Sequence, residues 1–250
     1  MSTSIVYGIN AVASLIERSP QKIDELVFVG SQKNRRLETL LDIAAAAGLR
    51  VLAEDAQSFA DKLAQEGIER DAVHQGVYAR CRVSEPLSES ALLALVRRVE
   101  NPFLLVLDGV TDPHNMGACL RSACAAGVDA VVVPKDKSAG LTATARKVAS
   151  GAAEITPLAI VTNLARCLQK LQSENVWVMG AAGESKSTLY DLDLRGGLAL
   201  VMGSEGSGLR RLTRESCDQL FSIPMAPDIE SLNVSVAAGV CLFEARRQRL

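Results

Sequence analysis

The fold of this chain is decided by one stretch, Phe103-Leu-Leu-Val-Leu107 followed by Asp108-Gly-Val-Thr-Asp-Pro-His-Asn-Met-Gly-Ala-Cys-Leu-Arg121. Five consecutive apolar residues without alternation predict a strand that is buried on both faces. A polar turn then leads into a predicted helix over residues 116–126. A buried strand followed by a helix is the repeating unit of a parallel α/β sheet.

The same alternation continues to the end of the chain. Further apolar runs occupy residues 130–133, 176–179, 198–202 and 220–223, and helices are predicted over residues 142–150, 164–173 and 232–247. Residues 101–250 are therefore predicted to form one α/β domain, a parallel sheet covered by helices.

The first part of the chain is predicted to be a separate, small α/β domain, residues 1–82. Its helices are predicted over residues 8–17 and 35–47, and its strands over residues 25–30, 50–53 and 74–79. A polar stretch containing Pro86 follows, which is typical of a domain junction. Residues 83–100 are therefore predicted to be a linker that includes a short helix, about residues 91–99.

Composition excludes several classes of protein. Of 250 residues, 48% are hydrophobic and 22% are charged, so the chain can build a core and is not disordered. The net charge is −2, so any site for a polyanion is a local patch. Aromatic residues make up only 4%, which argues against an aromatic platform for stacking bases. No apolar run is long enough to span a membrane and no secretory signal is visible, so we expect a cytoplasmic protein.

The six cysteines predict neither a disulfide framework nor a metal site. None of them forms a Cys-x-x-Cys pair, and most lie in apolar, helix-like surroundings. A reduced cysteine in such surroundings acts as a small apolar residue.

Ligands of open parallel sheets bind beyond the carboxyl ends of the strands, so the polar residues there are candidates for a site. After the run that ends at Leu107, Asn115 is placed to cap the next helix. Arg121 lies six positions further on, in an otherwise apolar helix, where a charge usually has a partner or a function. The alternative is a helix cap and a solvated arginine.

Two later loops follow predicted strands in the same way. Val201-Met-Gly-Ser-Glu-Gly-Ser-Gly-Leu209 combines three glycines with Glu205, which looks buried. Its spacing differs from the dinucleotide-binding Gly-x-Gly-x-x-Gly, so a sharp turn is the alternative. The second loop places Ser231 and Asn233 just before an apolar helix, where they can cap the helix or help to bind an anionic group.

Taken together, the three segments resemble the three motifs of the SpoU family. Its members are 2′-O-ribose RNA methyltransferases of the SPOUT superfamily that use S-adenosylmethionine. The matching segments are Asn115 with Arg121, Gly203-Ser-Glu-Gly206, and Ile223-Pro-Met225 with Ser231-Leu-Asn-Val-Ser235. Near the N-terminus, Tyr7-Gly-Ile-Asn-Ala-Val12 and His74-Gln-Gly76 resemble the small RNA-binding domain of one branch, the bacterial 23S rRNA guanosine-2′-O-methyltransferases.

The resemblance implies a fold, an activity and partners. It implies that the C-terminal segment of the parallel-sheet domain is threaded into a trefoil knot, that the chain forms a homodimer through this domain, and that it acts on a specific guanosine of 23S rRNA without a metal or a membrane. It implies cofactor contacts by Gly203, Gly206, Ile223, Met225 and Leu232. It implies catalytic roles for Asn115, Arg121, Glu205, Ser231 and Asn233. Local basic groups would contact the RNA; candidates are Lys33, Arg35 and Arg36, Lys135 and Lys137, Arg146 and Lys147, and Arg210, Arg211 and Arg214.

The general base stays open at this point. A ribose 2′-hydroxyl is a poor nucleophile until it loses its proton. His114, beside Asn115, is one candidate base. The resemblance to the family assigns that role to Arg121. Because arginine stays protonated in proteins, we expect Arg121 instead to bind the target phosphate and to stabilise the 2′-alkoxide.

Two alternatives come from other functional classes. A non-catalytic RNA-binding module would be expected to lack Arg121, Glu205 or Asn233, and all three are present. A nucleotide-dependent oxidoreductase would need Gly-x-Gly-x-x-Gly after its first strand, and the sequence has none there.

Overall fold

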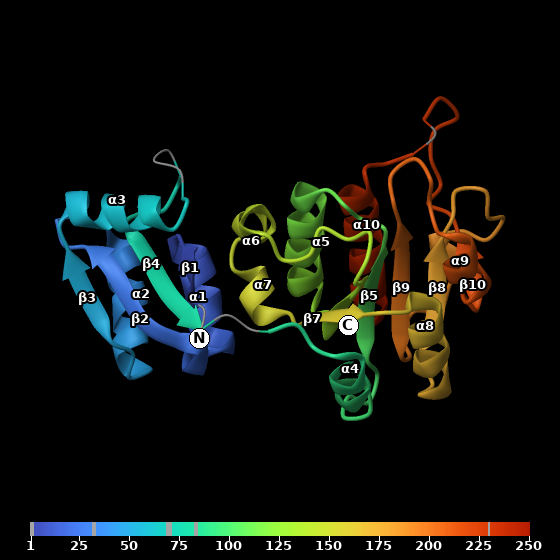
Figure 1. Cartoon of the computed structure of the whole chain (residues 1–250), viewed down its shortest axis with the longest axis horizontal. Helices are drawn as coiled ribbons and strands as arrows, with labels where there is room; N and C mark the ends of the chain where they lie inside the picture. Colours follow the sequence, from blue (N-terminus) through green and yellow to red (C-terminus); the bar gives the residue numbers. More distant parts are fainter. Residues whose placement is uncertain (1–2, 32–33, 69–71, 83–84, 230) are drawn as a thin grey trace. The chain divides into compact units, whose positions relative to one another are not determined.

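The computed structural model describes residues 3–31, 34–68, 72–82, 85–229 and 231–250, and the chain divides into two compact units (Figure 1). The first unit comprises residues 1–85 and 150–155, and the second comprises residues 86–149 and 156–250. These boundaries differ from the predicted ones, because residues 86–100 group with the second unit and residues 150–155 with the first. Lys33, Val83 and Ser84, which belong to two of the predictions above, lie outside the described residues.

The first unit is a four-stranded sheet with helices on both faces. Its strands, in spatial order, are β1 (Thr3–Tyr7), β4 (Val77–Arg82), β2 (Ile23–Val29) and β3 (Val51–Glu54). One face packs against α1 (Ile9–Arg18) and α2 (Arg35–Ala46), and the other against α3 (Ala56–Gln65). The short segments η1 (Pro20–Lys22) and α7 (Ala152–Ile155) complete the unit.

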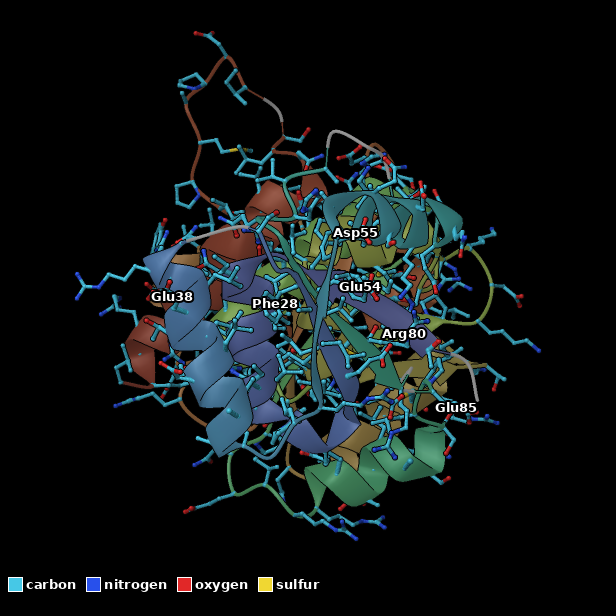
Figure 2. All side chains as sticks on the ribbon, turned by 90° about the vertical axis from the view of Figure 1, so that its left-hand side faces the viewer. Phe28, Glu38, Glu54, Asp55, Arg80 and Glu85 are labelled. Atoms are coloured by element: carbon cyan, nitrogen blue, oxygen red, sulfur yellow. The ribbon has the colours of Figure 1, made fainter. Side chains whose placement is uncertain are left out.

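Local sequence explains where the helices of this unit begin. Asp55 follows β3 directly and accepts hydrogen bonds from the backbone N–H groups of Gln57 and Ser58, so it is the N-cap of α3 (Figure 2). Asn34 caps α2 in the same way, through Arg36 N. Short polar side chains at these positions satisfy N–H groups that a helix leaves unpaired.

The second unit is a six-stranded sheet in which all strands run parallel. In spatial order they are β10 (Gln219–Phe221), β8 (Trp177–Ala181), β9 (Leu198–Gly203), β5 (Phe103–Asp108), β6 (Ala130–Pro134) and β7 (Leu158–Val161). The helices of the unit are α4 (Glu89–Val96), α5 (Pro113–Ala126), α6 (Ala143–Ala149), α8 (Leu164–Ser173), α9 (Arg211–Glu215) and α10 (Val234–Gln248), with the short turn η2 (Leu189–Asp191). The predicted parallel sheet is confirmed.

Helices cover both faces of this sheet, which explains its continuous apolar strands. Alternate residues of β5, Leu104 and Val106, pack in a core with α4 and α8. On the other face α10 packs against β9 and α5. Every residue of β5 is buried, as expected of a central strand that has helices on both sides. The threading of the C-terminal segment into a knot remains a prediction.

Two differences from the predicted elements have local causes. Strand β7 was not predicted, because it has only four residues and follows directly on Pro157. Strand β4 begins at Val77 rather than at His74, because Gln75 and Gly76 adopt positive φ angles of 54° and 72° and form a turn. Strand β1 and helix α3 in the first unit were also not predicted.

The predicted linker packs into the second unit through Leu87. Leu87 N donates to Leu158 O at 2.7 Å, and Leu87 O accepts from Ile160 N at 3.0 Å, so this residue extends the edge of the sheet beside β7. Helix α4 then buries Leu92 and Val96 in the core.

The last residues of the chain bind the amino edge of the sheet. The Arg249 guanidinium donates to Leu194 O at 2.9 Å, to Asn101 O at 3.1 Å and to Gly196 O. It also lies 4.6 Å from the centre of the Phe103 ring, a cation–π distance. Burial lowers the pKa of Arg249 from its ordinary value. These contacts fix the end of α10 to the chain segments that lead into β5 and β9.

Candidate functional site

The candidate site lies at the carboxyl edge of the second sheet, where β5 and β9 end side by side. These strands pair in register, with Asp108 opposite Gly203. After β5 the chain turns at Gly109, whose φ is 85°, and enters α5. After β9 it forms the glycine loop, residues 203–209.

Asn115 does not cap α5, contrary to the prediction. The N-cap is Asp112, which accepts from His114 N at 3.0 Å and from Asn115 N at 3.3 Å, and Pro113 follows it in the first turn. Proline suits that position because its missing N–H would be unpaired there. The Asn115 amide is therefore free to bind other segments of the chain.

Asn233 is the N-cap of α10, one of the two roles considered for it. Its Oδ1 accepts from Ser235 N at 2.9 Å and from the Ser235 hydroxyl at 2.6 Å. Its Nδ2 donates to Asn115 Oδ1 at 3.0 Å. One side chain thus caps a helix and binds the first turn of another.

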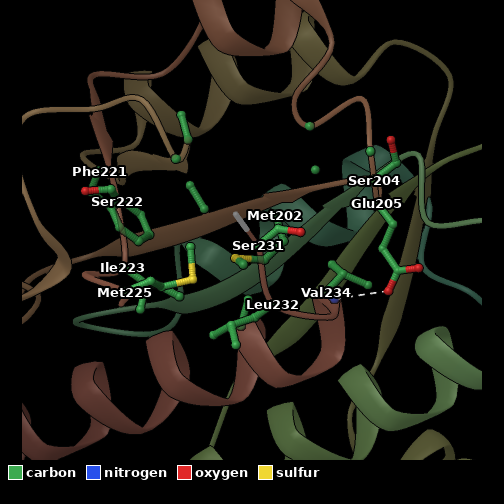
Figure 3. A pocket seen from close by; sticks show the side chains of 17 residues that line it. Met202, Ser204, Glu205, Phe221, Ser222, Ile223, Met225, Ser231, Leu232 and Val234 are labelled. Atoms are coloured by element: carbon green, nitrogen blue, oxygen red, sulfur yellow. Dashed lines mark hydrogen bonds between the residues drawn. The ribbon is translucent and has the colours of Figure 1, made fainter. Parts of the chain in front are cut away.

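Glu205 connects these two asparagines. Its Oε1 accepts from Asn115 Nδ2 at 3.2 Å and from Asn233 Nδ2 at 2.5 Å. It also accepts from Val234 N at 3.3 Å, the bond that is drawn in Figure 3. The residue is exposed, whereas it looked buried in the sequence. A carboxylate at the N-terminus of α10 is favoured by the partial positive charge of the helix end. Residues from three segments, separated by 90 and 28 positions, therefore form one network.

A pocket of about 370 Å³ lies beside this network (Figure 3). Ser231 lines this pocket. So do all five residues to which the resemblance assigned cofactor contacts: Gly203, Gly206, Ile223, Met225 and Leu232. Met202, Phe221 and Val234 add apolar surface. A pocket with apolar walls and a few polar groups is typical of a small-molecule site.

The glycines give the pocket a wall of exposed backbone. A Cβ on Gly203 would lie 2.2 Å from the carbonyl carbon of Gly208, so no other residue fits beneath the folded loop. Gly206 and Gly208 have φ angles of 81° and 63°, a region that glycine adopts without strain. The wall therefore lets a ligand approach the main chain closely, which fits an adenosyl cofactor held by backbone groups.

Arg121 lies apart from the network. Its side chain is exposed and forms no hydrogen bond or ion pair within the part of the chain that the structure describes. It follows Gly117 by about one helical turn, and Gly117 packs closely against Ala145 and Val148 of α6. Arg121 is thus on the α6 side of α5. His114 is exposed as well, in the first turn of α5.

An ion pair between a buried carboxylate and a partly exposed arginine was not predicted from the sequence. Asp108, at the end of β5, is fully buried, and both of its carboxylate oxygens bind Arg210. Asp108 stands directly after an apolar run, which is a usable signal for a buried polar residue. Nothing in the sequence points to its partner 102 positions later.

Five of the candidate RNA contacts fall into two groups. Three arginines pair with carboxylates: Arg210 with Asp108, Arg211 with Glu215 and Arg214 with Glu184. Lys135 and Lys137, in the loop after β6, are exposed and form no ion pair among the described residues. This loop lies against the turn before α5, because Ala139 N donates to Val110 O at 3.0 Å. The lysines therefore lie at the same edge of the sheet as the site.

Buried thiols do not contribute reactive groups. Burial raises the pKa of Cys119 and Cys241 to about 12, so these thiols stay protonated and unreactive near neutral pH. Within the described residues, His, Cys, Asp and Glu form no group of three that could hold a metal ion. In the same part of the chain, no helix combines the length and the apolar character needed to cross a bilayer.

Comparison with known proteins identifies relatives for both parts of the chain. Residues 102–243 match the SpoU rRNA methylase family, and residues 5–87 match the substrate-binding domain of RNA 2′-O ribose methyltransferases. The chain is 56% identical over 247 residues to the 23S rRNA (guanosine-2′-O-)-methyltransferase RlmB of Yersinia pestis, covering 99% of this chain and 98% of the relative. It is 53% identical over 247 residues to RlmB of Escherichia coli K12, covering 99% of both chains.

Solved structures share the fold. The SpoU methyltransferase AviRb from Streptomyces viridochromogenes, in complex with AdoMet, superposes with a TM-score of 0.73 at 23% identity, over 98% of this chain and 89% of AviRb. The TrmH/SpoU tRNA-modifying enzyme of A. aeolicus superposes with a TM-score of 0.54 at 26% identity, over 64% of this chain and 84% of that enzyme.

Proposed function

The chain belongs to the SpoU rRNA methylase family, and on this basis we propose that it transfers a methyl group from S-adenosyl-L-methionine to the ribose 2′-hydroxyl of a guanosine in 23S rRNA. The observation that carries the proposal is the network on Glu205, which joins the three motif segments beside a glycine-walled pocket. Both lie at the carboxyl edge of a parallel sheet, where such folds bind their ligands.

In this proposal the pocket residues hold the cofactor. Backbone groups of Gly203 and Gly206 contact its polar parts, and Ile223, Met225 and Leu232 enclose its adenine and methionine portions. S-adenosylmethionine, when bound, supplies an electrophilic methyl group on a sulfonium sulfur. Ser231, which lines the same pocket, lies where it can donate a hydrogen bond to the substrate.

The catalytic groups then have separate tasks. Asn115, Glu205 and Asn233 fix the two helix N-termini that border the site. Arg121 binds a phosphate of the target nucleotide and stabilises negative charge on the 2′-oxygen as its proton leaves. His114, in the first turn of α5, is the candidate group for accepting that proton.

We assign substrate selection to the N-terminal domain, residues 1–82. The match of residues 5–87 to the substrate-binding domain of ribose methyltransferases supports this assignment. Lys135 and Lys137 are the proposed phosphate contacts near the site, because they are exposed cations at the same edge of the sheet. The proposed location of the protein is the cytoplasm.

The proposed assembly is a homodimer formed through the second unit. Helix α10 exposes Val236 and Phe243, 52% and 51% accessible, two helical turns apart on one side. Exposed apolar groups in a row are typical of an association surface. Sedimentation at micromolar concentration should give twice the monomer mass of 26.6 kDa for the wild type and a smaller mass for Phe243→Asp.

The activity itself is tested on the full chain with purified RNA. Incubation with S-adenosylmethionine and unmethylated 23S rRNA should produce one 2′-O-methylguanosine, which mass mapping locates. The same nucleotide should lack its methyl group in cells without the gene. Methylation of tRNA alone, or calorimetric binding of NAD in place of S-adenosylmethionine, would contradict the proposal.

A further inference from the structure

We propose that Asp108 and Arg210 are positioning residues that hold the glycine loop in its functional shape, an inference that rests on the proposed function of the site. Asp108 is the last residue of β5, and its side chain is fully shielded from solvent. A buried carboxylate costs free energy unless donors surround it. The identity of those donors is therefore informative.

A single residue supplies the donors to both carboxylate oxygens. Arg210 N donates to Asp108 Oδ2 at 3.0 Å, and Arg210 Nε donates to Oδ1 at 2.5 Å, with a further contact from Nη2. Asp108 thus holds both the backbone and the guanidinium of Arg210. A planar guanidinium provides this geometry, whereas an ammonium group provides only a point charge.

Asp108 also fixes the start of the glycine loop. The loop begins at Gly203, which pairs with Asp108 in the β5–β9 register, and its end leads directly into Arg210. Between them, Ser204 and Gly208 exchange two backbone hydrogen bonds of 3.1 and 3.0 Å. One end of the loop therefore lies beside Asp108 in the sheet, and the other end is hydrogen-bonded to the Asp108 side chain.

The loop carries two parts of the site. Gly203 and Gly206 contribute the backbone wall of the pocket, and Glu205 accepts the hydrogen bonds that join α5 to α10. A loop end released from Asp108 would shift all three residues together. Because a misplacement of about 1 Å can cost a hundredfold in rate, the effect should reach both cofactor binding and methyl transfer.

The test compares Arg210→Lys with Arg195→Lys in the full-length protein. Arg195 is the matched control, because its backbone N and its guanidinium also bind a single aspartate, Asp193, but on the exposed surface and away from the pocket. Arg210→Lys should bind S-adenosylmethionine roughly tenfold more weakly or worse, and should methylate RNA more slowly even at saturating cofactor. Without cofactor, amide hydrogen exchange at Ser204 and Gly208 should speed up. Arg195→Lys should match the wild type in all three measurements.

Asp108→Asn provides the second variant, because it keeps an acceptor for Arg210 N and removes the charge. In the double variant, the losses of cofactor affinity and methylation rate should be smaller than the sum of the losses in the two single variants, since both substitutions act on one contact. The inference would be overturned if a folded Arg210→Lys or Asp108→Asn variant kept its affinity for S-adenosylmethionine and its amide hydrogen exchange at Ser204 and Gly208. It would also be overturned if these variants lost thermal stability while all of these properties stayed unchanged. Failure of the wild type to bind S-adenosylmethionine would instead contradict the proposed function.

Discussion

At the scale of single residues, the site depends on side chains that serve two segments at once. Asn233 caps α10 and binds Asn115, and Glu205 accepts from both. Each contact alone contributes about 1 kcal/mol in typical proteins. Linked contacts of this kind favour one arrangement of helices over nearby alternatives, which a site that orients a substrate requires.

Arg121→Ala should lower the rate of methyl transfer by roughly a hundredfold or more, because it removes the proposed stabiliser of the 2′-oxygen. Arg121→Lys should also lose much of the rate, since lysine keeps the positive charge but not the planar guanidinium that can bind a phosphate through two hydrogen bonds. Cofactor affinity should change little, because Arg121 does not line the pocket. Single-turnover methyl transfer and cofactor titration on the same samples measure both effects.

Thermal stability is the control for Arg121. The side chain is exposed and has no partner among the described residues, so Arg121→Ala should melt at nearly the same temperature as the wild type. A near wild-type transfer rate would make His114 the leading catalytic candidate. Unfolding of the variant would point to a structural role for Arg121.

His74 makes the stability of the first unit depend on pH. Its Nδ1 accepts from Gly76 N at 3.0 Å, and its ring lies 5.1 Å from that of Phe59. Burial lowers the pKa of His74 below its ordinary value of 6.5. The unfolded chain therefore binds a proton at a higher pH than the folded one does. This contribution to stability is fully present above about pH 6.5 and is lost as the pH falls toward the lower, folded-state pKa.

His74→Asn tests this dependence, because Oδ1 of asparagine can accept the same hydrogen bond and does not titrate. Between about pH 7.5 and 5.5, the melting temperature of the wild type should fall more than that of the variant. Equal falls in the two proteins would show that other groups account for the pH dependence.

At the scale of elements, helix α10 is held at both ends. Asn233 fixes its start to the site, and Arg249 fixes its end to the opposite edge of the sheet. Arg249→Ala removes three hydrogen bonds and a cation–π contact, so we expect a loss of about 2 kcal/mol in the free energy of unfolding. For a chain of this size, this loss lowers the melting temperature by about 4–8 °C.

Arg247→Ala is the control for this loss. Arg247 is exposed and pairs with Glu244 one turn earlier on α10. Surface ion pairs of this kind contribute about 0.5 kcal/mol at most to the free energy of unfolding. The melting temperature of the variant should therefore lie within about 1–2 °C of that of the wild type. Equal melting temperatures for Arg247→Ala and Arg249→Ala would contradict the conclusion that the contacts of Arg249 stabilise the protein more than a surface ion pair does.

The sequence predicted those elements whose cause is local. Continuous apolar runs predicted five of the six strands of the second sheet, because burial on both faces requires them. Seven of the ten site residues that the motif segments suggested line the pocket, and their roles toward cofactor and substrate remain predictions. Two features were not predicted: the pairing of Asp108 with Arg210, which depends on tertiary structure, and the cap of α5 by Asp112 in place of Asn115, which is local. Register and competition between neighbouring caps decide these features.

At the scale of the whole molecule, we expect the first unit to select the RNA substrate and the second unit to bind the cofactor. A chain without residues 1–82 should keep its affinity for S-adenosylmethionine, because every residue of the pocket belongs to the second unit. It should lose methylation of 23S rRNA, because the proposed substrate-binding domain is missing. Calorimetry and a methylation assay on the same preparation measure the two properties. If the chain without residues 1–82 methylated 23S rRNA as efficiently as the wild type does, the assignment of substrate selection to the first unit would be wrong.

The order of the three site segments along the chain also has a consequence for biosynthesis. The network needs Asn233, the N-cap of α10, and that helix is held at its far end by Arg249. Asn115 and Glu205 precede both residues in the sequence, so they leave the ribosome earlier during translation. A nascent chain that has not yet reached α10 can fold its first unit and most of its second sheet, but it lacks residues that the network needs. Chains truncated before α10 should therefore be unable to modify RNA.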